Sequence, residues 1–221
     1  MRPVPRSSPA AGSAASRVRG SWFIALPVPT DSWWSRVCAP PASARLFAPA
    51  DVHLTVAFLG PVDEKAAEAA FELAPQWPTG TLAATLTGVV AMGNPRRPSA
   101  FSVMVGEGAE EIARAIASVR DDMCGRAGAR CDDRPPLPHV TIARPNRSAG
   151  RAEREAMLAW AQALDLGTPR VRLTSLALYT RAEDRSVRLF REHARYELPE
   201  SSPPASPPSS PPASPPASPP R

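Results

Sequence analysis

The sequence predicts an α+β fold of two similar lobes, each with a mainly antiparallel sheet and helices packed on its outer face, around a central cleft. Two observations predict it. A short strand with the pattern His-x-Thr occurs at His53 and again at His139. Around each copy the same order of elements is expected, namely helix, strand, helix, strand, strand. The repeat unit, which runs from His53 to His139, is typical of paired lobes and is too long for a solenoid.

The 221-residue chain is long enough for one sizeable domain. Residues 1–20 are rich in Ser, Ala, Pro and Arg, residues 201–221 consist largely of Ser-Pro-Pro units, and neither segment has the apolar side chains that a core needs. We therefore expect a disordered arm over 1–20, one bilobal domain over 21–200 and a disordered tail over 201–221. The formal net charge of +5 comes from the arginines of the two end segments. The neutral body gives no general indication of nucleic-acid binding.

Local patterns predict the elements of the first half. The body opens with a strand over 22–26, which two prolines stop, and Thr30 or Asp31 is suited to cap a helix that runs to about residue 39. The first His-x-Thr strand follows over 52–59. Asp63 is then expected to be the N-cap of a helix that runs to about residue 77.

The second half follows the same rules. Apolar periodicity and turn residues predict further strands near 81–91, 100–105, 138–143, 170–179 and 186–197, and helices over about 109–124 and 151–164.

The two His-x-Thr strands should each present one polar face. Side chains two apart on a strand share a face. The faces predicted to line the cleft are His53, Thr55 and Ala57 in the first strand, and His139, Thr141 and Ala143 in the second. The opposite faces, expected to pack on helices, are Leu54, Val56 and Phe58, and Val140 and Ile142.

A single His-x-Thr is more often a satisfied histidine beside a strand-forming threonine than a site. Its recurrence in both halves, with two of the three histidines of the chain, favours a function. Neither strand has a Cys, Asp or Glu at the spacing a zinc site needs, so no metal is expected. The sequence also has no G-x-S-x-G motif for serine catalysis. His193 lies among charged residues and is interpreted as non-functional.

The chemistry that remains is acid–base catalysis on a phosphodiester. Because histidine titrates near neutrality, one imidazole can take a proton from an attacking water while the other gives a proton to the leaving oxygen. Thr55 and Thr141 could donate hydrogen bonds to the non-bridging oxygens.

The cysteines and the hydropathy indicate a compartment. Cys38, Cys124 and Cys131 are an odd number without a C-x-x-C spacing, which predicts a reducing compartment and no structural disulfide. No apolar run approaches the roughly 20 residues that span a bilayer. The N-terminus has no apolar signal region. We therefore expect a cytoplasmic protein without a membrane partner.

Residues 53–60 and 138–144, with their paired H-x-T-x motifs, resemble the two-histidine (2H) phosphoesterases. The most similar branch is the bacterial RNA 2′,3′-cyclic phosphodiesterases, also called 2′-5′ RNA ligase or LigT-like proteins. The resemblance extends to 22–27 and 176–179 and covers about 21–198.

This resemblance implies hydrolysis of a terminal 2′,3′-cyclic phosphate on RNA to a 2′-phosphate, without metal. We expect no other cofactor and a monomeric protein. It implies that His53 is the proton donor to the leaving 3′-oxygen and His139 the proton acceptor from water. Thr55 and Thr141 would bind the phosphate. Arg144 would be a further phosphate contact, or else an ordinary surface arginine. The partners implied are RNA ends or nucleotides with a 2′,3′-cyclic phosphate.

One departure concerns the base. Members of the family often have a Leu-Trp pair after a Pro-Arg-rich turn, where this chain has Ser99-Ala100-Phe101-Ser102. Phe101 would stack on the base in place of the tryptophan, or nothing stacks there. Arg96 and Arg97 on that turn either contact the RNA backbone or are simply solvated. Three other functions stay open, namely an RNA-binding module without turnover, a 2′-5′ RNA ligase, and a phosphodiesterase for another cyclic phosphate.

Overall fold

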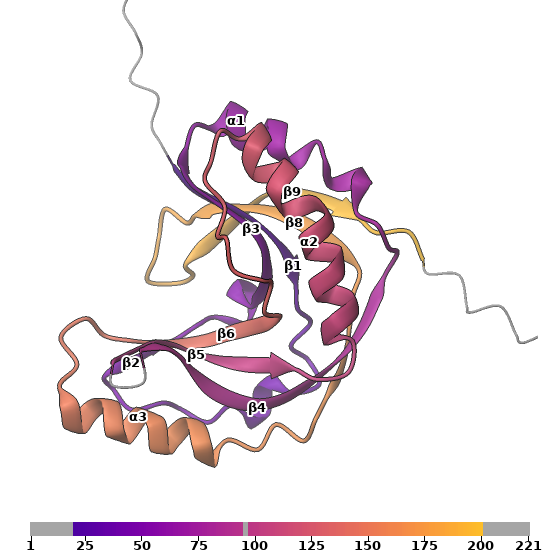
Figure 1. The fold of residues 1–221 in the computed structure, drawn as a ribbon. Helices are drawn as coiled ribbons and strands as arrows, with labels where there is room; N and C mark the ends of the chain where they lie inside the picture. Colours follow the sequence, from indigo (N-terminus) through magenta and orange to yellow (C-terminus); the bar gives the residue numbers. More distant parts are fainter. Residues whose placement is uncertain (1–19, 95–96, 201–221) are drawn as a thin grey trace, which may run out of the picture.

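The computed structural model describes residues 20–94 and 97–200. The predictions of a disordered arm and tail fall outside these residues, Gly20 excepted, and so does Arg96. One curled antiparallel sheet of nine strands dominates the fold (Figure 1), which confirms the α+β class. The strands are β1 (Gly20–Pro27), β2 (Ala44–Leu46), β3 (His53–Val62), β4 (Leu82–Asn94), β5 (Arg97–Val105), β6 (His139–Pro145), β7 (Arg170–Leu173), β8 (Ser175–Arg181) and β9 (Phe190–Glu197).

The strand order is β7-β4-β5-β6-β3-β1-β8-β9, with β2 paired to β6. Along this order four strands lie on each side of the junction between β3 and β6, the two strands that carry His-x-Thr, and β2 adds a fifth on the β6 side. At that junction one residue pair is formed, between Leu54 and Val140. This arrangement fits two lobes that share one sheet, although the repeat itself stays a prediction.

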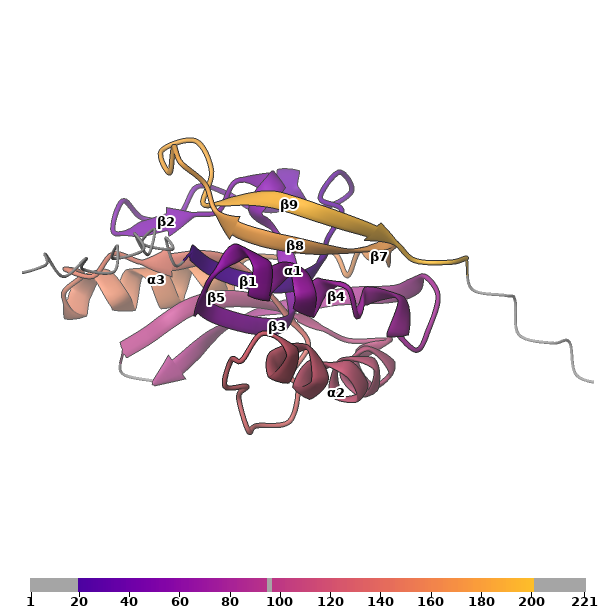
Figure 2. The same ribbon diagram turned by 90° about the horizontal axis from the view of Figure 1, so that it is seen from above.

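Three α-helices cover the sheet: α1 (Glu64–Phe71), α2 (Ala109–Arg126) and α3 (Arg151–Ala163). α2 packs against β3 and α1, while α3 packs against β4 and β5 (Figure 1). Seen from above, β8 and β9 lie on one side of the molecule and α2 on the other (Figure 2). The main core fills the space between sheet and helices. No helix in 20–94 or 97–200 is long and apolar enough to cross a membrane.

The predicted helix over 31–39 is wrong. That segment contains only a 3-10 turn, Trp34–Arg36. The indole of Trp33 is fully buried and donates a hydrogen bond of 2.8 Å to the carbonyl of Pro29. Burial of this one large ring fixes the segment in an irregular path, because the gain from burying an indole exceeds what a short helix contributes.

The helix after β3 begins as predicted but ends before residue 77. The Asp63 side chain accepts a hydrogen bond of 2.9 Å from the Ala66 N–H, which confirms the N-cap. α1 ends at Phe71, and a separate 3-10 turn spans Ala74–Gln76. Pro75 lies inside that turn and has no N–H to continue an α-helix.

The expectation of no structural disulfide is also wrong. Cys124, near the end of α2, is bonded to Cys131, with a Cα–Cα distance of 5.7 Å. Gly128 adopts a left-handed conformation with φ of 64° just after the helix and turns the chain back toward it. Seven residues of separation form no local motif, so the sequence spacing gave no indication of the pairing.

Candidate active site

The junction of β3 and β6 brings the two motifs together. Leu54 and Val140 are paired and their side chains are buried, so the residues that flank them point to the opposite, open face. In an antiparallel register about this pair, His53 lies opposite Thr141, and Thr55 lies opposite His139. The four predicted residues therefore form a diagonal arrangement of two imidazoles and two hydroxyls.

Both strands contain a bulge directly after the His-x-Thr. Opposite β1, Ala57 pairs with Ile24 and Thr55 with Ala25, so Val56 is the extra residue. Opposite β5, the same irregularity leaves out Ile142. An extra residue reverses the alternation of side chains beyond it.

The bulges correct the predicted faces. Ala57 and Ala143, expected on the open face, are buried in the core, while Phe58, expected in the core, is 59% exposed. Arg144 is exposed at the corresponding place in β6. Matching bulges thus add an aromatic ring to one motif and a guanidinium to the other.

His53 lies half-buried among aromatic rings that the sequence did not identify as part of a site. Its ring centroid is 4.7 Å from that of Phe23, 5.4 Å from that of Phe190 and 5.7 Å from that of Tyr179. These rings come from β1, β9 and β8, three strands of one half of the sheet. No local motif could have indicated them, because only the sheet order brings these strands beside His53.

Both histidines are oriented by the same contact. Nδ1 of His53 lies 2.6 Å from the carbonyl oxygen of Asp51, and Nδ1 of His139 lies 2.7 Å from that of Leu137. A carbonyl oxygen only accepts, so each Nδ1 carries the hydrogen. Nε2 of each ring is left for chemistry in the open face.

Asp51 was not predicted to belong to the site. Its side chain is buried, and its two carboxylate oxygens accept hydrogen bonds of 2.6 Å from the Leu189 N–H and 3.0 Å from the Phe190 N–H. The start of β9 is thereby held against His53. The sequence shows an Asp two residues before the motif, but it shows neither the burial of this residue nor its remote backbone partners.

Burial lowers the pKa of His53 to about 4. The hydrogen bond to the Asp51 carbonyl and the Asp51 charge act against this shift, whereas the charges of Arg144 and His139 add to it. Arg144 and His139 therefore lie within electrostatic reach of His53. In the free site the His53 ring is neutral at pH 7.

The remaining polar groups of the two motifs are also placed. Thr141 Oγ1 is 3.1 Å from Ser102 Oγ. The Arg144 guanidinium lies 5.9 Å from the centroid of the Phe47 ring, a cation–π contact that limits where it can point. Thr55, Phe58 and His139 line a cavity of about 320 Å³ with the segment between α2 and β6.

A family model described as the 2′-5′ RNA ligase superfamily matches residues 29–185, more than half of the chain. The chain belongs to the 2′-5′ RNA ligase superfamily. The resemblance inferred from the paired motifs is thus confirmed, and membership of this superfamily supports phosphoesterase or RNA ligase activity. No curated protein matches the chain.

Solved structures of other proteins have the same fold as this chain. Escherichia coli LigT complexed with 3′-AMP is 21% identical with a TM-score of 0.59, and LigT complexed with NADP⁺ is 21% identical with a TM-score of 0.57; both matches cover 82% of this chain and 99% of LigT. The protein TT0787 of Thermus thermophilus is 19% identical with a TM-score of 0.62, covering 80% of this chain and 97% of that one.

Phe101 is placed differently from the prediction that it stacks on a base. In this superfamily member its ring is fully buried and makes an edge contact with Trp160 of α3, at 6.0 Å between centroids. The β6 bulge lies opposite Phe101, and the apolar core takes up the ring on the helix side. Phe58 is instead the exposed aromatic residue beside the histidines.

One group among the described residues has the composition of a metal site. Ligand atoms of Glu64, Glu68 and His193 lie within 4.8 Å of one another. His193 Nε2 is 2.9 Å from Glu68 Oε1, and its ring makes an edge contact with Trp22. Trp22 and Phe23 are adjacent on β1 and point to opposite faces, so this cluster lies on the face away from His53. It links α1 to β9 through the hydrogen bond between His193 and Glu68.

Proposed function

We propose that this protein hydrolyses the terminal 2′,3′-cyclic phosphate of RNA to a 2′-phosphate, with His53 and His139 as acid and base and without a metal ion. The observation that carries the proposal is the arrangement about the Leu54–Val140 pair, where two imidazoles and two hydroxyls share one face. Each imidazole has its Nδ1 held by a carbonyl, which leaves both Nε2 atoms available. Relatives solved with 3′-AMP and ATP support a nucleotide ligand.

In this mechanism His139 Nε2 accepts a proton from a water molecule as its oxygen attacks phosphorus. The bond between phosphorus and the 3′-oxygen breaks on the opposite side, and His53 Nε2 donates a proton to that oxygen. The products are a 2′-phosphate and a 3′-hydroxyl. Thr55 and Thr141 donate hydrogen bonds to the non-bridging oxygens, and Arg144 offsets the charge that develops there.

Proton donation requires a charged His53, whereas burial keeps its pKa at about 4 in the free site. A phosphate anion bound beside the ring favours the charged form and raises that pKa. Substrate binding thus creates the acid that the leaving group needs. The base of the terminal nucleotide stacks on Phe58 at the mouth of the adjoining cavity, in the role first expected of Phe101.

The first test is direct. His53→Ala and His139→Ala each abolish hydrolysis of a 2′,3′-cyclic mononucleotide, while circular dichroism shows a folded protein and EDTA leaves wild-type activity unchanged. His193→Ala, on the opposite face, is the matched control and retains activity. Substantial turnover by either active-site variant contradicts the proposal.

Joining of RNA ends through a 2′-5′ linkage is the second candidate, because the matching family model is named for that reaction. Incubation of cleaved tRNA halves with the protein, followed by gel analysis of the joined product, distinguishes it from hydrolysis. If the protein binds a cyclic end but neither consumes nor joins it, the chain is an RNA-binding module. A panel of cyclic phosphates separates RNA ends from other substrates.

The proposed substrate also bears on the location of the protein in the cell and on its oligomeric state. RNA fits a cytoplasmic monomer in which both histidines come from one chain. The bond between Cys124 and Cys131 removes the earlier argument from unpaired cysteines. Fractionation of cells and light scattering of the purified protein test location and oligomeric state.

A further inference from the structure

We propose that a second site on this protein binds a backbone phosphate of the RNA, upstream of the cyclic end. The site is the hollow between the start of β5 and the start of α3. This inference rests on the proposed function and deepens it, because it makes a polynucleotide the preferred substrate over a mononucleotide.

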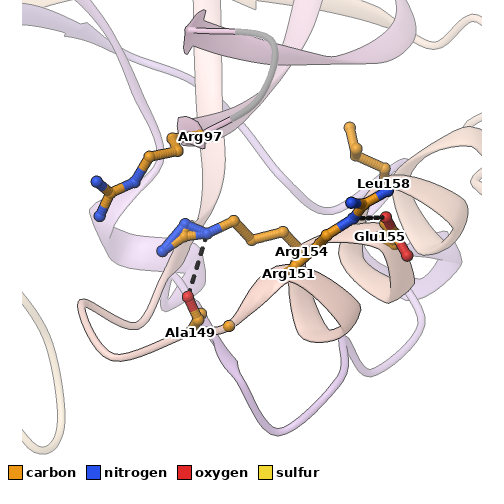
Figure 3. A pocket seen from close by; sticks show the side chains of 7 residues that line it. Arg97, Ala149, Arg151, Arg154, Glu155 and Leu158 are labelled. Atoms are coloured by element: carbon orange, nitrogen blue, oxygen red, sulfur yellow. Dashed lines mark hydrogen bonds and ion pairs between the residues drawn. The ribbon is translucent and has the colours of Figure 1, made fainter.

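The hollow has a volume of about 790 Å³, and arginines from two elements line it. Arg97 comes from β5, while Arg151 and Arg154 come from the first turns of α3 (Figure 3). Ala149 and Gly150, at the N-terminal end of α3, and Glu155 and Leu158, further along the helix, complete the lining. Figure 3 shows the guanidinium groups of Arg97 and Arg154 on the same side of the hollow.

Arg97 and Arg154 have no carboxylate partner within the described part of the chain. Arg151 Nε donates to Glu155 at 2.8 Å, and Glu153 accepts from the Gly150 N–H at 2.5 Å, so both nearby carboxylates are engaged. Arg154 Nε donates to the carbonyl of Ala149 at 3.2 Å, which leaves its charge uncompensated. In a body without net charge, this pair of unneutralised guanidinium groups is a local site for an anion.

The position of the hollow identifies the anion. Thr141 pairs with Ser102 on β5, and Arg97 is five residues further along that strand, roughly 17 Å away at the usual rise per residue. A single cyclic nucleotide held at Thr141 does not reach that far. A few nucleotides of single-stranded RNA do, and their phosphodiesters match guanidinium groups in charge and geometry.

Kinetics on two substrates test this site. The substrates are a 2′,3′-cyclic mononucleotide and a single-stranded octanucleotide with the same cyclic end. The double variant Arg97→Gln/Arg154→Gln is expected to lower kcat/KM for the octanucleotide about tenfold, with a change below about twofold for the mononucleotide. The control, Arg126→Gln/Arg191→Gln, removes the same charge from exposed arginines outside both cavities and leaves both substrates unaffected.

Salt dependence supplies a second readout. For single strands, each lost phosphate contact reduces the slope of log(kcat/KM) against log salt concentration by about 0.7. A less steep slope for the octanucleotide, unchanged in the control, supports the site. Equal losses on both substrates, or no loss on the octanucleotide, overturn it.

Failure of the proposed function has a different outcome. If the wild-type protein hydrolyses neither substrate, binding of a fluorescent octanucleotide with a 3′-phosphate end is measured by anisotropy. Weaker binding by Arg97→Gln/Arg154→Gln than by the control still supports the second site, and equal binding overturns it.

Discussion

Asp51 holds two parts of the site with different atoms. Its carbonyl oxygen accepts the Nδ1 hydrogen of His53, and its carboxylate accepts the N–H groups of Leu189 and Phe190. The amino group of an asparagine cannot accept a hydrogen bond, so Asp51→Asn leaves one buried N–H unpaired. The expected results are a loss of about 1–3 kcal/mol in the free energy of unfolding and a fall of roughly 10- to 100-fold in kcat.

The pH profile of kcat/KM distinguishes a role of Asp51 in the site from a purely structural one. The Asp51 charge raises the pKa of His53, so its removal moves the acid limb of kcat/KM to lower pH. Asp184→Asn is the control, because Asp184 accepts a backbone N–H in the same way but is exposed and remote from the histidine. An unaltered acid limb in Asp51→Asn would show that the carboxylate does not influence the ring.

The burial of His53 also predicts how kcat/KM depends on pH. The reaction needs a single proton on the pair of imidazoles, so kcat/KM should hold down to about pH 4 and fall below it, where the buried His53 ring takes up a second proton. Phe190→Ala admits water to the ring, which weakens desolvation and moves the break upward toward the ordinary value of about 6.5. Phe71→Ala, a half-buried ring on α1, should leave the break in place. Identical breaks in all three proteins would mean that burial does not set this pKa.

The same shift has a consequence for stability. Between pH 6.5 and about 4 the unfolded chain binds a proton at this residue and the native protein does not, so stability falls as the pH falls through that interval. The packing that favours the neutral ring therefore lowers the free energy of unfolding only at acidic pH.

At the scale of elements, the disulfide closes the segment that enters β6. That segment lines the cavity beside His139, and its Leu137 carbonyl orients the His139 ring. Cys131→Ser should lower the free energy of unfolding by about 2 kcal/mol, the value expected for so short a loop, and raise KM by loosening the cavity wall.

Urea unfolding with and without reductant measures this effect. Wild type and Cys131→Ser should coincide once the wild type is reduced, and Cys38→Ser, which removes the exposed free thiol, should match the oxidised wild type. Equal midpoints for oxidised and reduced wild type would contradict a stabilising bond.

The elements that the sequence predicted well are those with a strong internal pattern. α2 and α3 follow apolar stripes, and β3 and β6 follow alternation as far as Thr55 and Thr141. Beyond those residues alternation fails, because each bulge is set by the strand alongside rather than by its own sequence. β2 has three residues and no apolar pattern, so only its pairing with β6 defines it.

On the scale of the whole molecule, the site divides into a part that repetition identified and a part that topology assembled. The recurrence of His-x-Thr was sufficient to predict that His53, Thr55, His139 and Thr141 share one face, while their roles stay a proposal. Phe23, Tyr179 and Phe190 join His53 only because β1, β8 and β9 follow β3 in the sheet order. The arginines of the hollow at α3 likewise come together because α3 packs against β5.

Among the described residues, β3 and β6 form a single residue pair, Leu54 with Val140, and the two imidazoles lie beside it. The proposed donor and acceptor therefore lie on opposite sides of the most sparsely paired junction of the sheet, which α2 spans by packing against β3 and α1. A small change of twist at that junction should alter the distance between the two Nε2 atoms, so the size of these two aliphatic side chains should adjust that distance without changing a group proposed to bind the phosphate.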